Sequence, residues 1–359
     1  MVSAQSLVRP GHGGNLTWAA SIAGCSPSDI LDFSASINPW GPPQSALAAI
    51  QDHLGDLRAY PDPQYRALRK AISQAHTPLE PEWILPGNGA AELLTWAGWD
   101  LAQQETTYLP TPAFGDYKRS LSAVQATVIE WPLSEYQGKW SLTPGLDRRG
   151  GLLLNNPHNP TGRLFEQDIL KPFLEQFDLV VVDEAFMDFL PPNQQQSLIH
   201  SVTEYQNLVI LRSLTKFYSI PGLRLGYAIA HPERLRRWQQ WRDPWPVNVL
   251  AAAVGTAVLQ DCCFQQKTWD WLTTARSQLI TGLAQLPGLR PYPSAANFLL
   301  VYSAYPVPEL QISLLQCHRI LIRDCLSFPE LGQHYFRVAI RTEAENQRLM
   351  TALQEILHL

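Results

Sequence analysis

The sequence predicts an α/β fold in which a large domain with a mostly parallel, mixed sheet is joined to a small α+β domain. First, short apolar runs alternate with helical segments through the middle of the chain. Second, two of these runs, 179–182 and 208–211, are apolar at consecutive positions, which is typical of strands buried on both faces. Third, 359 residues are many for one core, so we expect two lobes.

The expected elements of the large domain follow one another as strand and helix. In chain order they are a strand in WILPG (83–87), a helix from about Ala90, a strand in TTYLP (106–110), a helix in AFGDYKRSLSA (113–123), and strands in GGLLLNN (150–156), DLVVVDEAF (178–186) and NLVILRSLTK (207–216). The segment RLGYAIA (224–230) follows too soon after Lys216 for a crossover helix to intervene. We therefore expect it to be an antiparallel strand.

The last hundred residues have a different pattern. NFLLVYS (297–303), RILIRDC (319–325) and YFRVAIR (335–341) predict strands of a smaller sheet, and EAENQRLMTALQEILHL (343–359) predicts a closing helix. We expect residues 1–45 to form an N-terminal arm that belongs partly to the small domain, residues 46–260 the large domain, and residues 261–359 the small domain.

Composition excludes several classes of protein. The net charge of −5 gives no footprint for nucleic acid, and no apolar run is long enough to span a bilayer. Five cysteines without C-x-x-C spacing argue against a disulfide framework or a zinc site, and the first residues lack the apolar core of a signal peptide. We expect a cytoplasmic protein. The basic stretch ERLRRWQQWRDPW (233–245) indicates an amphipathic helix whose Trp238 and Trp241 face inward.

Lys216 is the most informative residue, because it is one of six lysines and lies in the apolar stretch SLTKFYSIPGLRLGY (213–227). A lysine with a lowered pKa can bond covalently to an aldehyde. Asp183 ends the preceding strand, LVVVD, where a buried carboxylate needs a positive partner. Ligands bind beyond the carboxyl ends of parallel strands. Asp183 is, from its position alone, equally compatible with a structural ion pair.

Two further turns supply candidate anion and hydrogen-bonding groups. Gly87-Asn88-Gly89 before a helix is a phosphate-binding geometry, to which Ser213 and Arg224 could add a hydroxyl and a charge. Asn159, in the turn NPHNPTG, could donate to a phenolate oxygen. Each turn by itself is more often only a turn. Together with the lysine and the acid, they match the four requirements of pyridoxal 5′-phosphate.

The motifs NPHNPTG, VVDEAF and SLTKFYSIPGLRLGY, in this order, resemble the fold-type I aminotransferase superfamily of pyridoxal-phosphate enzymes, and the resemblance runs nearly end to end. Two families within it compete: L-threonine-O-3-phosphate decarboxylases of cobalamin synthesis and histidinol-phosphate aminotransferases. HGGN (12–15), LDFSASINPWGPP (31–43) and LIRDC…YFRVAIR are closer to the decarboxylases. Phe186 also stands where the aminotransferases have a tyrosine after DEA.

The resemblance implies a role for each matched residue. For the cofactor these are Lys216 for the covalent bond, Asp183 for the pyridinium nitrogen, Asn159 for the phenolic oxygen, Gly89, Ala90, Ser213 and Arg224 for the phosphate, and Phe114 for stacking on the ring. Tyr60 would reach the cofactor phosphate of a neighbouring subunit, which implies a homodimer. For the substrate, Arg337 would bind the carboxylate, and Arg323, His12 and Asn15 the phosphate.

The activity implied is decarboxylation of L-threonine O-3-phosphate to (R)-1-aminopropan-2-yl phosphate and CO₂. Transamination of histidinol phosphate is the alternative, because the bond that breaks depends on which one stands perpendicular to the cofactor ring. A non-enzymatic ligand sensor of the same fold is a third reading. The acidic charge and the short segment before the fold count against it.

Overall fold

A seven-stranded sheet forms the centre of the computed structural model, which describes residues 9–136, 139–142 and 149–357. Its strands, in spatial order, are β2 (Ile84–Asn88), β10 (Leu225–Ala230), β9 (Leu208–Ser213), β8 (Leu179–Asp183), β7 (Gly151–Asn155), β3 (Thr107–Thr111) and β4 (Val128–Pro132). Only β10 within this sheet runs antiparallel to its neighbours, β2 and β9. The expected mixed, mostly parallel sheet and the antiparallel strand are therefore confirmed.

Both faces of this sheet are buried, because successive side chains of a strand point to opposite faces. One face packs against α4 (Ala90–Leu101), α5 (Gly115–Ala123) and α8 (Pro232–Trp241). The other face packs against α3 (Arg66–Ala75), α6 (Gln167–Gln176) and α9 (Val249–Val258). The two faces explain why the central strands read as uninterrupted apolar runs.

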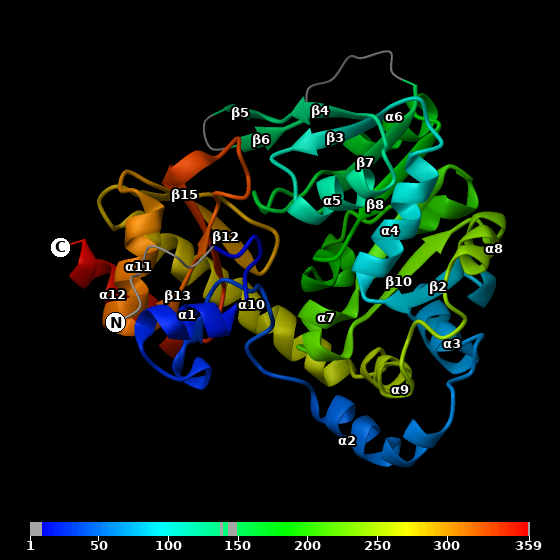
Figure 1. The fold of residues 1–359 in the computed structure, drawn as a ribbon, viewed down its shortest axis with the longest axis horizontal. Coiled ribbons are helices and arrows are strands. Elements are labelled where there is room, and N and C mark those ends of the chain that lie inside the picture. The colour runs from blue at the N-terminus through cyan, green and yellow to red at the C-terminus, as the bar shows by residue number, and fades with distance from the viewer. Residues whose placement is uncertain (1–8, 137–138, 143–148, 358–359) are drawn as a thin grey trace.

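A smaller sheet lies beside the first and is reached through the long helix α10 (Cys262–Ala284) (Figure 1). Its strands are β11 (Leu289–Pro291), β12 (Phe298–Ser303), β15 (Tyr335–Ala339) and β14 (Arg323–Asp324). The helices of this part are α11 (Val307–His318), α12 (Glu343–Ile356) and α1 (Leu16–Ala23). The small α+β part is confirmed, while the division at residues 45 and 260 stays a prediction.

The segment 319–325 is two short strands, where the sequence predicted one. Ile320–Leu321 (β13) pairs in parallel with Leu31–Asp32 (β1), and Arg323–Asp324 pairs with β15. Because the strand is interrupted at Ile322, the chain contributes to two sheets, β1–β13 and the small sheet that contains β15. The pairing with β13 attaches β1, which follows α1, to the small part of the molecule (Figure 1). The remaining elements are α2 (Gln44–Asp52), α7 (Leu214–Phe217) and the hairpin β5 (Ser134–Tyr136) and β6 (Lys139–Ser141).

Helix α8 departs from the prediction at Trp241. Trp238 is fully buried and its indole N–H donates to Asp100 at 3.0 Å, but Trp241 is 41% exposed and lies against Trp99. Arg234 is also tied to Asp100. The contacts of Asp100 on α4 therefore hold α8 against α4 at Arg234 and Trp238, and the last turn of α8, with Trp241, lies outside the core. Among the described residues, no helix is long and apolar enough to cross a membrane.

Candidate active site

The predicted polar residues meet at the carboxyl edge of the central sheet. Asp183, the last residue of β8, is the register partner of Asn155 at the end of β7. Ser213, the last residue of β9, is the partner of Gly226 on β10. Since β8 and β9 are parallel neighbours, Asp183 and the segment that carries Lys216 lie side by side, as predicted.

Asp183 is a buried carboxylate with two protein donors. The hydroxyl of Tyr117 donates to Oδ2 at 2.8 Å, and the backbone N–H of Ala185 donates to Oδ1 at 2.9 Å. Burial raises the pKa of Asp183, although the charge of Lys216 and the two hydrogen bonds act in the opposite direction. These contacts stabilise the ionised carboxylate and fix its orientation.

Lys216 lies on the one-turn helix α7, just beyond β9, and is half-buried, at the wall of the cavity described below. Burial lowers the pKa of its ammonium group against the attraction of Asp183. Its Nζ lies 5.0 Å from the ring centroid of Phe186, the residue at the family's tyrosine position. The backbone N–H of Asn38 donates to the carbonyl of Lys216 at 3.0 Å, which anchors the helix. A lysine in this setting is suited to covalent chemistry.

The turn predicted to bind the cofactor phosphate directly precedes helix α4. Gly89 has a φ of +76° and precedes α4, so the free N–H groups of that helix begin at Ala90. A Cβ at Gly89 would lie 2.6 Å from Nη2 of Arg224, which places the guanidinium against the turn. Ser213 is bonded to Thr215 at 2.7 Å between their hydroxyl oxygens. The N-terminus of α4 and the guanidinium of Arg224 therefore lie side by side, an arrangement suited to an anion.

Asn159 and Arg337 are in contact, although 178 positions separate them in the sequence. The guanidinium of Arg337 donates to Oδ1 of Asn159 and lies 4.7 Å from the ring centroid of Phe298. Burial and the neighbouring charge of Arg323 lower the pKa of Arg337 to about 10, despite the opposing effect of Cys325. Its Nε is buried without a partner among the described residues. An anion bound here would relieve this desolvated charge.

Arg323 is the register partner of Arg337 in the pair β14–β15, so the two guanidinium groups come from adjacent strands. Arg323 is buried and donates to the carbonyls of Pro10 and Gly11 at 3.1 and 2.6 Å, and to the hydroxyl of Ser327. The arginine therefore fastens the N-terminal arm across the site. The first eight residues of that arm lie outside the described part of the chain.

The two other predicted arm residues lie differently. His12 is half exposed, with its ring 5.6 Å from that of Phe114 and its Nε2 3.9 Å from Asp116. The side chain of Asn15 accepts from the backbone N–H of Trp18 at 3.0 Å and caps α1. It does not line the cavity described next.

A cavity of about 250 Å³ brings some of these groups together, but its lining does not include Asp183, Asn159 or the residues predicted to bind the cofactor phosphate. Of the predicted residues it is lined by His12, Phe114, Lys216, Arg323 and Arg337. Tyr60 is not among them: its side chain is 78% exposed, and its ring stacks on Trp245 with centroids 4.3 Å apart.

Three residues of the site were missed by sequence reasoning: Tyr117, Thr215 and Ser327. Tyr117 follows Phe114 by three positions, so helical spacing on α5 could have placed both side chains on one face. Thr215 lies within the lysine motif itself. Ser327 follows the strand of Arg323 in a loop that gave no signal.

The residues present fit pyridoxal 5′-phosphate. Lysine and acid lie at neighbouring strand ends, the helix N-terminus with Arg224 offers an anion cradle, and Phe114 lies against Tyr117, the partner of Asp183. A donor site for the phenolic oxygen is available at Asn159, which is 6% exposed. The chemistry of this donor set matches the separate needs of an aldehyde, a ring nitrogen, a phenol and a phosphate.

The chain was compared with known families and proteins. The model of the family "Aminotransferase class I and II" matches residues 28–353. The chain is 40% identical to a threonine-phosphate decarboxylase of Salmonella typhimurium, over 98% of both chains. It is 31% identical to an adenosylcobalamin biosynthesis bifunctional protein of Leptospira interrogans, over 97% of this chain but 41% of that protein. The crystal structure of a histidinol-phosphate aminotransferase from Clostridium acetobutylicum superposes with a TM-score of 0.83 at 27% identity, covering 92% of this chain and 99% of that one.

Proposed function

The chain belongs to the class I and II aminotransferase family, and within it we propose that it decarboxylates L-threonine O-3-phosphate to (R)-1-aminopropan-2-yl phosphate and CO₂ in cobalamin biosynthesis. Its cofactor is pyridoxal 5′-phosphate. The observation that carries the proposal is the pairing of Arg323 with Arg337 in one cavity with Lys216. Two adjacent arginines favour a substrate with two anionic groups. Threonine phosphate offers a carboxylate and a phosphate, and the 40% identity to a decarboxylase of this substrate class supports the same choice.

Each cofactor contact is part of the proposal. The residues that hold the cofactor are Lys216 at the aldehyde carbon, Asp183 at the ring nitrogen, Asn159 at the phenolic oxygen, Phe114 on the ring face, and Gly89, Ala90, Ser213 and Arg224 at the phosphate. When bound, pyridoxal 5′-phosphate draws electrons from the bonds at the substrate's Cα. Asp183, whose carboxylate accepts hydrogen bonds from Tyr117 and Ala185, would hold the proton of the ring nitrogen in place.

The two arginines orient the substrate and so determine which bond at its Cα reacts. Arg337 binds the carboxylate of the substrate, while Arg323, aided by His12, binds its phosphate. Because the phosphate takes no part in the reaction, its binding energy serves to orient the carboxylate. The arm that Arg323 fastens covers the cavity and restricts water. The ammonium group of Lys216, whose pKa burial lowers, would donate a proton to Cα in place of the CO₂ that leaves, and the lysine would be left as the neutral amine.

A homodimer is also part of the proposal. The segment 40–60, together with Trp245, which stacks on Tyr60, exposes several large apolar side chains: Trp40, Leu47, Leu54, Leu57, Tyr60 and Trp245. A second copy of the chain would cover them and receive the Tyr60 hydroxyl at its cofactor phosphate. Five free cysteines among the described residues agree with a cytoplasmic location.

Histidinol-phosphate aminotransferase is the second candidate, favoured by the structural match to a protein of that name. A direct competition separates the two. Purified protein receives threonine phosphate and histidinol phosphate together with 2-oxoglutarate, and products are followed by mass spectrometry. Formation of aminopropanol phosphate without glutamate supports the decarboxylase, whereas formation of glutamate from histidinol phosphate reverses the assignment.

A further inference from the structure

A second cavity, of about 480 Å³, lies behind the lysine helix. It is lined by Arg212 of β9, whose side chain points to the opposite face from that of Ser213. Phe217 and Tyr218, which directly follow Lys216, form part of its wall. The helix turn α7 therefore separates this cavity from the one that holds the proposed reaction.

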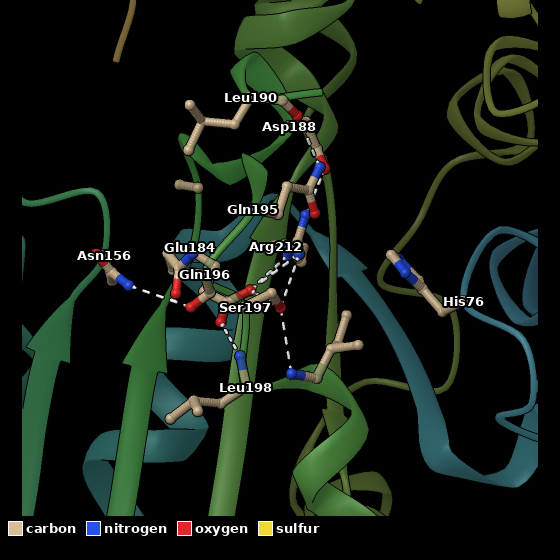
Figure 2. Close-up of polar contacts among 12 residues, drawn as sticks. His76, Asn156, Glu184, Asp188, Leu190, Gln195, Gln196, Ser197, Leu198 and Arg212 are labelled. Carbon is tan, nitrogen blue, oxygen red and sulfur yellow. Dashed lines mark hydrogen bonds and ion pairs between the residues drawn. The ribbon is translucent and has the colours of Figure 1, made fainter. Parts of the chain in front are cut away.

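The polar wall of the cavity is a buried ionic cluster (Figure 2). Arg212 is 1% exposed and is bonded to Glu184 at 2.9 Å, to Ser197 at 3.1 Å and to Asp188. Glu184 is fully buried and also accepts from Ser197 at 2.6 Å and from the N–H of Leu198 at 3.0 Å. Two carboxylates thus share one guanidinium, which leaves the ionised cluster with one uncompensated negative charge.

The carboxylate of Asp188 places the uncompensated negative charge at the cavity wall. Arg212 holds its Oδ1, and no donor among the described residues is bonded to Oδ2. Its side chain keeps 20% of its surface exposed, at the cavity wall. Burial raises the pKa of Asp188 despite the guanidinium beside it, so a cation bound next to Oδ2 would stabilise the ionised form.

The histidine across the cavity does not supply the missing charge. Burial, together with the charge of Arg212, lowers the pKa of His76 to about 3, so its ring is neutral near pH 7. Its Nε2 is 2.8 Å from the hydroxyl of Tyr227. Figure 2 shows His76 on the opposite side from Asp188 and Arg212, and both sides line the same space.

Four aromatic side chains form another part of the wall, beside aliphatic and amide side chains such as Ile199, Leu259 and Gln265. Phe217, Tyr218, Tyr227 and Trp269 line the cavity, and the indole N–H of Trp269 donates to the backbone carbonyl of Asp188 at 2.8 Å. That bond holds an aromatic ring beside the carboxylate. Aromatic rings next to a carboxylate recognise ammonium groups by cation–π attraction and charge.

We propose that this cavity binds a small organic ammonium ion, with Asp188 as its counter-ion and the aromatic side chains as its wall. An anion is disfavoured because the cluster is negative and Arg212 is already occupied by Glu184, Asp188 and Ser197. The described residues hold no group of three or more His, Cys, Asp or Glu side chains suited to a metal ion. A cavity of this volume lies in the range of small-molecule sites.

Calorimetric titration of the full-length, cofactor-loaded protein with choline and with tetramethylammonium tests the proposal. Quaternary ammonium ions cannot form an imine with the cofactor aldehyde, so covalent binding at the lysine site is excluded, and the variants locate the binding to this cavity. We expect saturable binding of one ion per chain, weakened about tenfold or more in Asp188→Asn and in Trp269→Leu, and less in Trp269→Phe. Asp270→Asn, an exposed acid on the same helix as Trp269, is the control and should bind like wild type.

The proposal is overturned by the absence of saturable binding of either ion, or by equal affinity of wild type and both weakened variants. Saturable binding of acetate that Asp188→Asn strengthens, in place of the ammonium ions, also overturns it. If Asp188→Asn fails to fold because Arg212 loses a partner, the comparison of Trp269→Leu with Trp269→Phe decides.

Discussion

The hydroxyl of Tyr117 donates a 2.8 Å hydrogen bond to Oδ2 of Asp183 and joins helix α5 to the end of strand β8. Both residues are buried, and burial raises the pKa of the tyrosine well above its ordinary value, so it remains a donor at any working pH. Because of this bond, the orientation of the Asp183 carboxylate depends on the positions of both α5 and β8. Phe114, the residue proposed to stack on the cofactor, begins the same helix.

Tyr117→Phe should therefore weaken the reaction through Asp183. Loss of one hydrogen bond to a buried charge costs about 1.5–3 kcal/mol, so we expect kcat to fall roughly ten- to a hundredfold with a smaller change in KM. The pH dependence of the bound cofactor's absorption should shift, because the pKa of the acid rises further. An unchanged pH profile in a folded variant would show that Tyr117 only packs.

Lys216→Ala should abolish covalent binding of the cofactor and lower decarboxylation at least about a thousandfold. Lys216→Arg is the matched control, because it keeps a positive charge beside Asp183 but cannot make the bond. Absorption spectra and turnover of both variants check this. Wild-type colour and turnover in either variant would remove the whole site assignment.

Substitutions of Arg323 and Arg337 should affect the kinetics with phosphorylated and unphosphorylated threonine differently. Arg323→Gln should raise KM for threonine phosphate about tenfold or more and affect unphosphorylated threonine less, because the phosphate contact is lost in addition to the bonds that fasten the arm. Arg337→Gln should impair both substrates. Steady-state kinetics with the two substrates measures the split, and equal losses in both variants would contradict the assigned roles.

Stability should fall in acid because of His158. This ring is buried, its Nδ1 lies 2.8 Å from the Thr161 hydroxyl, and burial lowers its pKa from 6.5 to about 3. Between about pH 6.5 and about pH 3, His158 is protonated in the unfolded chain but neutral in the folded chain. The free energy of unfolding should therefore fall by up to about 1.4 kcal/mol per pH unit across this window from this residue alone.

Urea unfolding between pH 4 and pH 7 in His158→Gln checks this, and its slope with pH should be smaller by up to one proton. Thr161→Val serves as the control, since it removes the hydrogen-bond partner but leaves the titrating ring. It should lower stability at every pH and keep the slope. An identical slope in wild type and His158→Gln would contradict the assignment.

The position of Asp183 beside the lysine segment was predictable because both follow strands with uninterrupted apolar runs, which only a doubly covered parallel sheet accommodates. The antiparallel strand β10 was predictable because too few residues separate it from Lys216. The cradle at Gly89 was predictable in kind, since a glycine turn before a helix has few other geometries.

The contacts between distant segments were not predictable. Arg337 and Asn159 meet because the small sheet packs over the large one, and local patterns carry no information on that packing. The prediction that Trp241 faces inward was wrong, because helical spacing predicts which face of a helix is apolar but not how far along the helix that face stays buried. Asp100 on another helix decides that the last turn of α8 stays outside. Asn15, expected near the substrate, has its oxygen engaged as a helix cap.

Release of the carboxyl carbon tests the central claim most directly. The protein, loaded with pyridoxal 5′-phosphate, receives threonine phosphate labelled with ¹³C at the carboxyl carbon, without any 2-oxo acid. We expect one labelled CO₂ for each (R)-1-aminopropan-2-yl phosphate formed over many turnovers. Label that stays in the amino acid, with turnover appearing only when 2-oxoglutarate and histidinol phosphate are added, would contradict the account.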